Sequence, residues 1–167
     1  MKLLQFAVAG IGVLLATAVS GHASAATVQR DVTSHGPANC QPQSVLDSKL
    51  VMRSTGIYNI GDSNSFVTCD FGADLNGSGF KTIEIWFLNN FGAGQVRCTL
   101  IDGSSLTGYK TITKSLWPLD PGLPTPLGWT TADNGGENFQ FPAVQCLLPP
   151  NYQLFNVHAV LDEDVGE

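Results

Sequence analysis

The stretch Lys81-Thr82-Ile83-Glu84-Ile85-Trp86-Phe87-Leu88 decides the fold class, because apolar and polar side chains alternate along it. In an extended strand every second side chain points to the same face. One face would carry Ile83, Ile85 and Phe87. The opposite face would carry Thr82, Glu84 and Trp86. Alternation with a period of two over this length predicts a strand that is buried on one face.

The same alternation recurs in other segments of the chain, which are residues 65–71, 95–101, 143–148 and 155–161. In the last of these, the apolar face would carry Phe155, Val157, Ala159 and Leu161, and the opposite face Asn156 and His158. Weaker strand patterns occupy residues 51–59, 109–116 and 128–131. Turn-forming pairs such as Asp102-Gly103 separate the segments, and none has convincing helical periodicity. The sequence predicts an all-β fold, an antiparallel β-sandwich of about seven or eight strands held by two disulfides.

Four cysteines lie well beyond the N-terminal segment: Cys40, Cys69, Cys98 and Cys146. An even number in an oxidising compartment predicts two disulfides, and the absence of a Cys-x-x-Cys pair argues against zinc. Three of the four fall on the apolar faces of their strands, which favours buried cystines that span the core. Three pairings are possible, of which we favour Cys40–Cys69 with Cys98–Cys146. Each bridge would stabilise the fold by about 3–4 kcal/mol.

The organisation of the chain begins with a predicted export signal. Lys2 precedes a long apolar run, and Ala23-Ser24-Ala25 fits the small-x-small pattern of a cleavage site, so residues 1–25 are predicted to be removed after Ala25. Residues 26–49 are predicted to be an irregular lead-in, residues 50–163 the β-sandwich domain, and residues 164–167 an acidic tail. We therefore expect a secreted or periplasmic protein with no membrane span after cleavage.

The residues also resemble those of a loose group of small, mostly uncharacterised exported bacterial proteins. The shared motifs are an early cysteine in Cys40-Gln41-Pro42, a G-x-x-N turn in Gly56-Ile57-Tyr58-Asn59, a V-x-C strand in Val67-Thr68-Cys69-Asp70, a C-x-L strand in Cys98-Thr99-Leu100, and Cys146-Leu147-Leu148-Pro149. The chain departs from the group at Asp70, where the group usually has proline. The resemblance implies a disulfide-bonded β-sandwich and implies no activity.

Charge and motif content exclude several functions. The chain has a net charge of −6 and no basic run, which argues against a nucleic-acid partner. Beyond the leader the histidines are His35, in the predicted lead-in, and His158, which faces outward, and no nucleophile motif accompanies them. We therefore predict no catalytic residues, no cofactor and no enzymatic activity; a secreted hydrolase is the least favoured alternative.

The sequence contains one weak candidate for a calcium-binding loop. Asp74, Asn76 and Ser78 are spaced like the first ligands of a calcium loop, but the twelfth position is Ile85 rather than an acidic residue. A polar turn at Asn76-Gly77 is the favoured interpretation, and no metal site is predicted.

Exposed aromatic side chains suggest the most specific function. Trp86 is predicted on the polar face of its strand, and Trp117 and Trp129 bracket a Pro-rich stretch. These rings could stack on sugar rings, or they could fill a core between two sheets. The favoured hypothesis is a non-catalytic binding module for an unknown glycan or protein ligand. The alternative is an envelope structural or assembly protein that pairs through exposed sheet edges.

Overall fold

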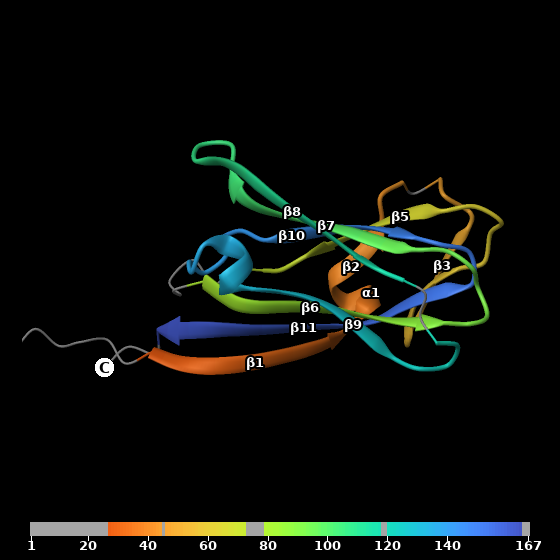
Figure 1. The fold of residues 1–167 in the computed structure, drawn as a ribbon, viewed down its shortest axis with the longest axis horizontal. Helices are drawn as coiled ribbons and strands as arrows, with labels where there is room; N and C mark the ends of the chain where they lie inside the picture. The colour runs from red at the N-terminus through yellow and green to blue at the C-terminus, as the bar shows by residue number, and fades with distance from the viewer. Residues whose placement is uncertain (1–26, 45, 73–78, 118–119, 165–167) are drawn as a thin grey trace, which may run out of the picture.

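The computed structural model describes residues 27–44, 46–72, 79–117 and 120–164 (Figure 1). The predicted export signal, most of the predicted acidic tail and the calcium candidate of Asp74, Asn76 and Ser78 lie outside the described residues. In the described part of the chain, neither helix has the length and hydropathy that crossing a bilayer requires.

The strands form two sheets in which all paired strands run antiparallel, so the predicted β-sandwich is confirmed (Figure 1). Sheet A contains β1 (Thr27–His35), β3 (Leu50–Arg53), β4 (Gly56–Asn59), β6 (Gly79–Asn89), β9 (Thr125–Thr130) and β11 (Tyr152–Asp164). Sheet B contains β2 (Cys40–Pro42), β5 (Ser65–Asp70), β7 (Val96–Ser104), β8 (Gly108–Leu116) and β10 (Ala143–Leu148). The helices are α1 (Gly36–Asn39) and the 3-10 helix η1 (Thr131–Asn134). The described residues thus form eleven strands rather than the seven or eight expected.

The core lies between the two sheets and contains most of the inner-facing residues that the alternation predicted, with Phe155 as an exception. The fully buried members from sheet A include Ile57, Ile83, Ile85, Phe87, Trp129, Tyr152 and Leu154. Those from sheet B include Val67, Cys69, Val96, Cys98, Leu100, Val144, Cys146 and Leu148. Burial of this apolar area is the main force that holds the sheets together.

Both favoured disulfides are present, but they do not span the core. Cys40 pairs with Cys69, and Cys98 pairs with Cys146. Each bridge joins residues directly opposite each other on neighbouring strands of sheet B, β2 with β5 and β7 with β10. The expectation of a core-spanning bridge was wrong, because an inward-facing cysteine meets an inward-facing cysteine on the adjacent strand before it can reach the other sheet.

The N-terminal segment is more ordered than the predicted lead-in of residues 26–49. β1 pairs with β11 along its whole length, from Thr27 opposite Asp164 to His35 opposite Asn156. All of its side chains except Ser34 are exposed, so no burial pattern marks it as a strand in the sequence. Its hydrogen bonds to β11 hold it extended, and the sandwich therefore begins near residue 27 and not near residue 50.

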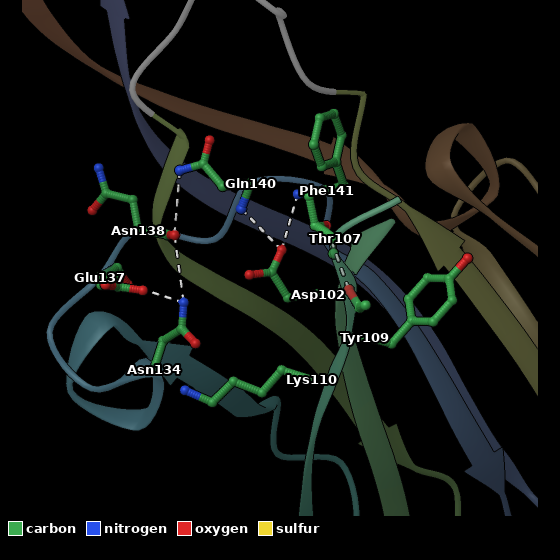
Figure 2. A pocket seen from close by; sticks show the side chains of 11 residues that line it. Asp102, Thr107, Tyr109, Lys110, Asn134, Glu137, Asn138, Gln140 and Phe141 are labelled. Carbon is green, nitrogen blue, oxygen red and sulfur yellow. Dashed lines mark hydrogen bonds between the residues drawn. The ribbon is translucent and has the colours of Figure 1, made fainter. Parts of the chain in front are cut away.

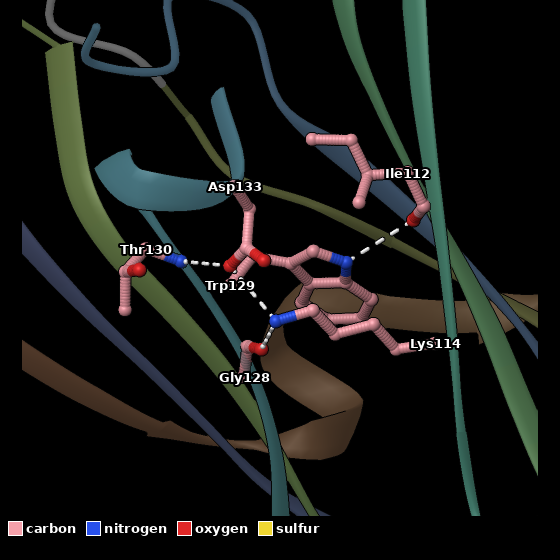
Figure 3. A network of polar contacts seen from close by, with 6 residues as sticks. All are labelled: Ile112, Lys114, Gly128, Trp129, Thr130 and Asp133. Carbon is pink, nitrogen blue, oxygen red and sulfur yellow. Dashed lines mark hydrogen bonds and ion pairs between the residues drawn. The ribbon is translucent and has the colours of Figure 1, made fainter. Parts of the chain in front are cut away.

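At one side of the sandwich, side chains join the edge strands β8 and β9 (Figure 3). The indole Nε1 of Trp129 donates to the carbonyl oxygen of Ile112 at 3.1 Å. The Lys114 ammonium donates to the carbonyl oxygen of Gly128 at 2.9 Å and to Asp133 Oδ2 at 2.8 Å. We call this network the β8–β9 seam. It connects the two sheets by polar contacts beside the core.

Candidate functional site: an aromatic groove on sheet A

Two adjoining hollows form a groove on the outer face of sheet A, the face turned away from sheet B. One, of about 400 Å³, is lined by Thr33, Glu84, Trp86, Pro124, Phe155, Asn156 and His158. The other, also of about 400 Å³, is lined by His35, Thr55, Tyr58, Leu88, Pro124, Gln153, Phe155 and Asn156. Because both are bounded by Pro124, Phe155 and Asn156, they are continuous. We call the combined surface the aromatic groove.

A β-bulge in β11 places an additional aromatic ring in the groove. Leu154 lies opposite Phe87, but the next paired residue is Asn156, opposite Trp86, so Phe155 is the extra residue of the bulge. A bulge breaks the period of two and redirects side chains. Phe155 therefore leaves the apolar inner face to which the alternation assigned it. Its ring packs edge-on against Trp86, with centroids 6.5 Å apart.

The apolar side chains form a row across consecutive strands. Tyr58 on β4 lies opposite Gln153, just before the bulge that carries Phe155. Trp86 on β6 lies opposite Asn156 on one side and Pro126 on the other. The row of Tyr58, Phe155 and Trp86 crosses β4, β11 and β6, a width of roughly 10 Å at about 4.8 Å for each strand spacing. It is therefore long enough to contact more than one sugar ring.

Polar side chains flank the row and are held in place by one another. His158 Nδ1 lies 3.2 Å from Glu84 Oε2, and His158 Nε2 lies 4.0 Å from Asp31 Oδ1. His35 Nδ1 lies 3.2 Å from Asn156 Oδ1. These groups provide donors and acceptors beside the rings. Glu84 is the one carboxylate among the described lining residues, which include no lysine, and Asp31 stands just outside them beside His158.

Tyr58 is fixed at the other end of the groove by two contacts. The Arg53 guanidinium lies over its ring, 5.0 Å from the centroid, and its hydroxyl lies 3.1 Å from Thr55 Oγ1. The Gln153 amide donates to the carbonyl oxygen of Thr55 at 2.8 Å, which fixes the β3–β4 turn beside it. The ring is therefore held by its neighbours before any ligand arrives.

The three tryptophans predicted to stack on a ligand have three different positions. Trp86 is half-buried on the outer face of sheet A, as the alternation predicted, and lines the groove. Trp117 is 68% exposed, follows β8 of the other sheet, and is not among the groove residues. Trp129 is completely buried and belongs to the β8–β9 seam, so the prediction that it stacks on a ligand was wrong. It faces inward because β9 continues sheet A over the core.

His35 and His158 both lie at the groove, although the sequence placed them apart. His35 ends β1 and is not in an irregular lead-in, and the pairing of β1 with β11 brings it near His158. Within the described residues, no group of three or more His, Cys, Asp or Glu side chains is arranged to hold a metal ion.

Sequence reasoning missed Phe155, Asn156, His35 and Pro124 as groove residues. Only strand pairing could have revealed the first three, because a bulge and an unpatterned edge strand bring them together. Pro124 belongs to the Pro-rich stretch before β9, whose position beside Trp86 also follows from pairing.

Comparisons with known proteins give only distant likenesses. No family model and no curated protein matches the chain. A solved Podospora anserina GH26-CBM35 β-(1,4)-mannanase matches with a TM-score of 0.40 and 8% identity, over 78% of this chain and 27% of that chain. The CBM61 module in complex with β-1,4-galactotriose matches with a TM-score of 0.36 and 8% identity, over 80% and 84%. A CBM35 from Paenibacillus barcinonensis matches with a TM-score of 0.34 and 9% identity, over 79% and 97%.

The chain thus spans about a quarter of the length of the mannanase that it matches. The assignment of the β-sandwich stands on the strand pairing of the chain itself.

Proposed function

We propose that this protein is an exported, non-catalytic glycan-binding module whose aromatic groove binds a neutral sugar chain. The observation that carries the proposal is the row of Tyr58, Phe155 and Trp86 on a sheet face that the core does not need. The apolar faces of sugar rings stack on such side chains, while hydroxyl groups pair with flanking polar groups.

The electrostatics of the groove support a neutral ligand. Glu84 and Asp31 stand at one side, and the chain carries a net charge of −6, so a polyanion would be repelled. The dimensions support a chain-like ligand in preference to a protein partner. Hollows of about 400 Å³ each are in the range of small-ligand sites, and the two adjoin along the sheet as a chain-like ligand would need.

Export is the second part of the proposal. Two disulfides support an oxidising compartment, and together with the predicted signal of residues 1–25 they favour a secreted or periplasmic location. Absence of enzymatic activity is likewise proposed. It is supported by the sequence, in which no nucleophile motif accompanies His35 or His158.

Affinity electrophoresis in native gels tests the proposal. The gels contain barley β-glucan, galactomannan, arabinoxylan or galactan, with polygalacturonate as the anionic comparison. We expect at least one neutral polysaccharide to retard the wild-type protein and polygalacturonate not to. Trp86→Ala should weaken the retardation at least about tenfold in apparent affinity, because a central aromatic anchor typically contributes about 2 kcal/mol or more. Phe155→Ala should weaken it as well.

Trp117→Ala is the matched control, because Trp117 is an exposed tryptophan outside the groove. It should be retarded like the wild type. The proposal fails if none of the four neutral polysaccharides retards the wild type, or if Trp86→Ala and Trp117→Ala migrate alike.

A further inference from the structure

A further hollow, of about 410 Å³, lies where the β7–β8 hairpin meets the segment after β9 (Figure 2). Its walls come from strands β7 and β8 of sheet B and from residues 134–141, and it shares no lining residue with the aromatic groove. This hollow and the aromatic groove are therefore separate places on the molecule. We call this one the hairpin pocket.

A buried carboxylate with one unused oxygen lies in the hairpin pocket. Asp102 is only 8% exposed. Its Oδ1 accepts hydrogen bonds from the backbone N–H groups of Gln140 and Phe141, both at 2.9 Å. Its Oδ2 has no hydrogen-bond partner among the described residues, and Figure 2 shows the carboxylate between the 137–141 segment and Lys110. Oδ2 is not among the fully buried atoms that lack a partner, so it is open to the pocket. A fixed carboxylate oxygen that faces a pocket with no protein partner is suited to accept from a ligand hydroxyl.

A second acceptor and a donor accompany Asp102. Asn134 is 6% exposed, and its amide nitrogen donates to the carbonyl oxygens of Glu137 and Asn138 at 3.2 and 3.4 Å. Its Oδ1 has no hydrogen-bond partner in the described part of the chain. Lys110 lies directly opposite Asp102 in the β7–β8 pairing and lines the same pocket. The pocket therefore combines two acceptors with an ammonium donor.

The backbone around the pocket is fixed by its turns. Gly103 has a φ of +112°, and a Cβ at this position would lie 2.2 Å from the carbonyl oxygen of Gly108. The turn between β7 and β8 is closed by Ser104 and Thr107, whose hydroxyl oxygens lie 3.1 Å apart. On the other wall, Gly135 ends η1 with a φ of +76°. Turns fixed in this way keep the polar groups of the pocket in place.

We propose that the hairpin pocket binds a single sugar residue by its hydroxyl groups. Two neighbouring hydroxyls of a sugar would donate to Asp102 Oδ2 and Asn134 Oδ1, and one of them would accept from Lys110. Tyr109, which is 65% exposed, lines the pocket as well and supplies an aromatic side chain at its edge. The pocket recognises the polar edge of one sugar residue, whereas the groove stacks on the faces of several.

Other ligand classes fit the pocket less well. Asp102 and Glu137 disfavour an anion, because each adds a negative charge to the lining. Lys110 disfavours a divalent cation, because its ammonium shares the pocket with the candidate oxygen ligands. A neutral polyol fits both groups, because its hydroxyls can donate to the Asp102 carboxylate and accept from the Lys110 ammonium. This inference rests on the proposed function only because both take the ligand to be a sugar. The two sites share no residue, so an experiment can refute one without refuting the other.

Amide NMR of the isotope-labelled protein tests the pocket, with galactose, mannose, glucose, xylose and N-acetylglucosamine titrated separately as free monosaccharides. We expect at least one of them to shift the amide signals of residues 103, 108–110 and 134–141. The amides around Trp86 and Phe155 should stay in place, because a single ring spans little of the groove. Asp102→Asn keeps an acceptor for the Gln140 and Phe141 amides and replaces Oδ2 by a donor. It should weaken binding at least about tenfold.

Lys110→Met should also weaken binding. Lys49→Met should leave it unchanged, because Lys49 precedes β3 of sheet A, donates to Ser63 and does not line the pocket. Shifts confined to groove amides would overturn the hairpin pocket and leave the groove standing. Pocket shifts that survive in both Asp102→Asn and Lys110→Met would overturn the assigned contacts. Absence of any shift with all five sugars would overturn the pocket proposal, whatever the polysaccharide gels show.

Discussion

The two faces of sheet A carry aromatic side chains for different reasons. On the inner face, Trp129, Phe87 and Tyr152 are completely buried, and their burial holds the sheets together. On the outer face, Trp86 and Phe155 pack against each other but remain half-exposed, and no second sheet covers them. The core accounts for the first set and does not account for the second. This difference is what directs attention to the outer face as a binding surface.

The outer face of sheet B sharpens the contrast. Its strands turn residues such as Arg97, Thr99 and Gln145 outward, and the hydroxyls of Thr99 and Thr113 lie 2.9 Å apart. This is the composition expected of a solvated sheet face. The aromatic row is thus a property of one sheet face and not of the sandwich in general.

Replacing each of two tryptophans by alanine should separate the two faces most clearly. Trp129→Ala should lower the free energy of unfolding by about 4–5 kcal/mol, because it opens a cavity in the core and removes the hydrogen bond to Ile112. Trp86→Ala should lower it by only about 1 kcal/mol, the size of a lost aromatic pair on a surface. Urea unfolding followed by circular dichroism measures both. Equal losses would show that the outer ring serves stability and not binding.

The disulfides should give a somewhat smaller effect, confined to stability. Replacing Cys98 and Cys146 together by alanine should lower the free energy of unfolding by about 4 kcal/mol, because the bridge closes a loop with a sequence separation of 48. Both bridges lie in sheet B, so polysaccharide binding at the groove on sheet A should persist wherever the variant remains folded. Urea unfolding and native gels on the same sample measure the two properties. Loss of binding in the folded variant would show that the two sheets are coupled.

The strands with clean alternation were predictable because each buries one face and exposes the other. This is why β5, β6, β7 and β10, and the inward cysteines, could be assigned from the sequence. The pairing Cys98–Cys146 was favoured correctly, but its position within one sheet depends on strand order, and periodicity carries no information on strand order.

The groove was harder to predict because its residues break local rules. The alternation predicts Phe155 in the core, but the bulge in β11 turns it to the outer face. The side chains of β1 do not alternate between buried and exposed, so the sequence does not mark β1 as a strand. Trp86 was found, since its own strand keeps the period of two through that position. Trp129 was misassigned, because a short segment beside a Pro-rich stretch does not reveal which of its faces the core will cover.

The smallest expected effect concerns the β8–β9 seam and its pH dependence. The hydrogen bond from the Lys114 ammonium, aided by the backbone N–H of Thr130, holds the pKa of Asp133 below its usual value of 3.8, and partial burial opposes this only in part. A carboxylate with a lowered pKa stabilises the fold fully above its unfolded-state pKa, and that stability is lost as the pH falls through the folded-state pKa. Asp133→Asn should therefore be less stable than the wild type at neutral pH, by about 1 kcal/mol or less, and the gap should narrow as the pH falls below 3.8 and through the folded-state pKa.

Thermal unfolding of both proteins between neutral pH and about pH 2 measures this gap. Lys114→Met is the control, because it removes the cation that lowers the pKa. In that background, Asp133→Asn should produce a smaller gap with a weaker pH dependence. A gap that stays constant down to the lowest pH would mean that Asp133 acts through the hydrogen bond to the Thr130 amide and not through its charge. The seam would then be a neutral turn contact, and the polar link between the sheets would rest on Trp129 and on the bond from Lys114 to Gly128.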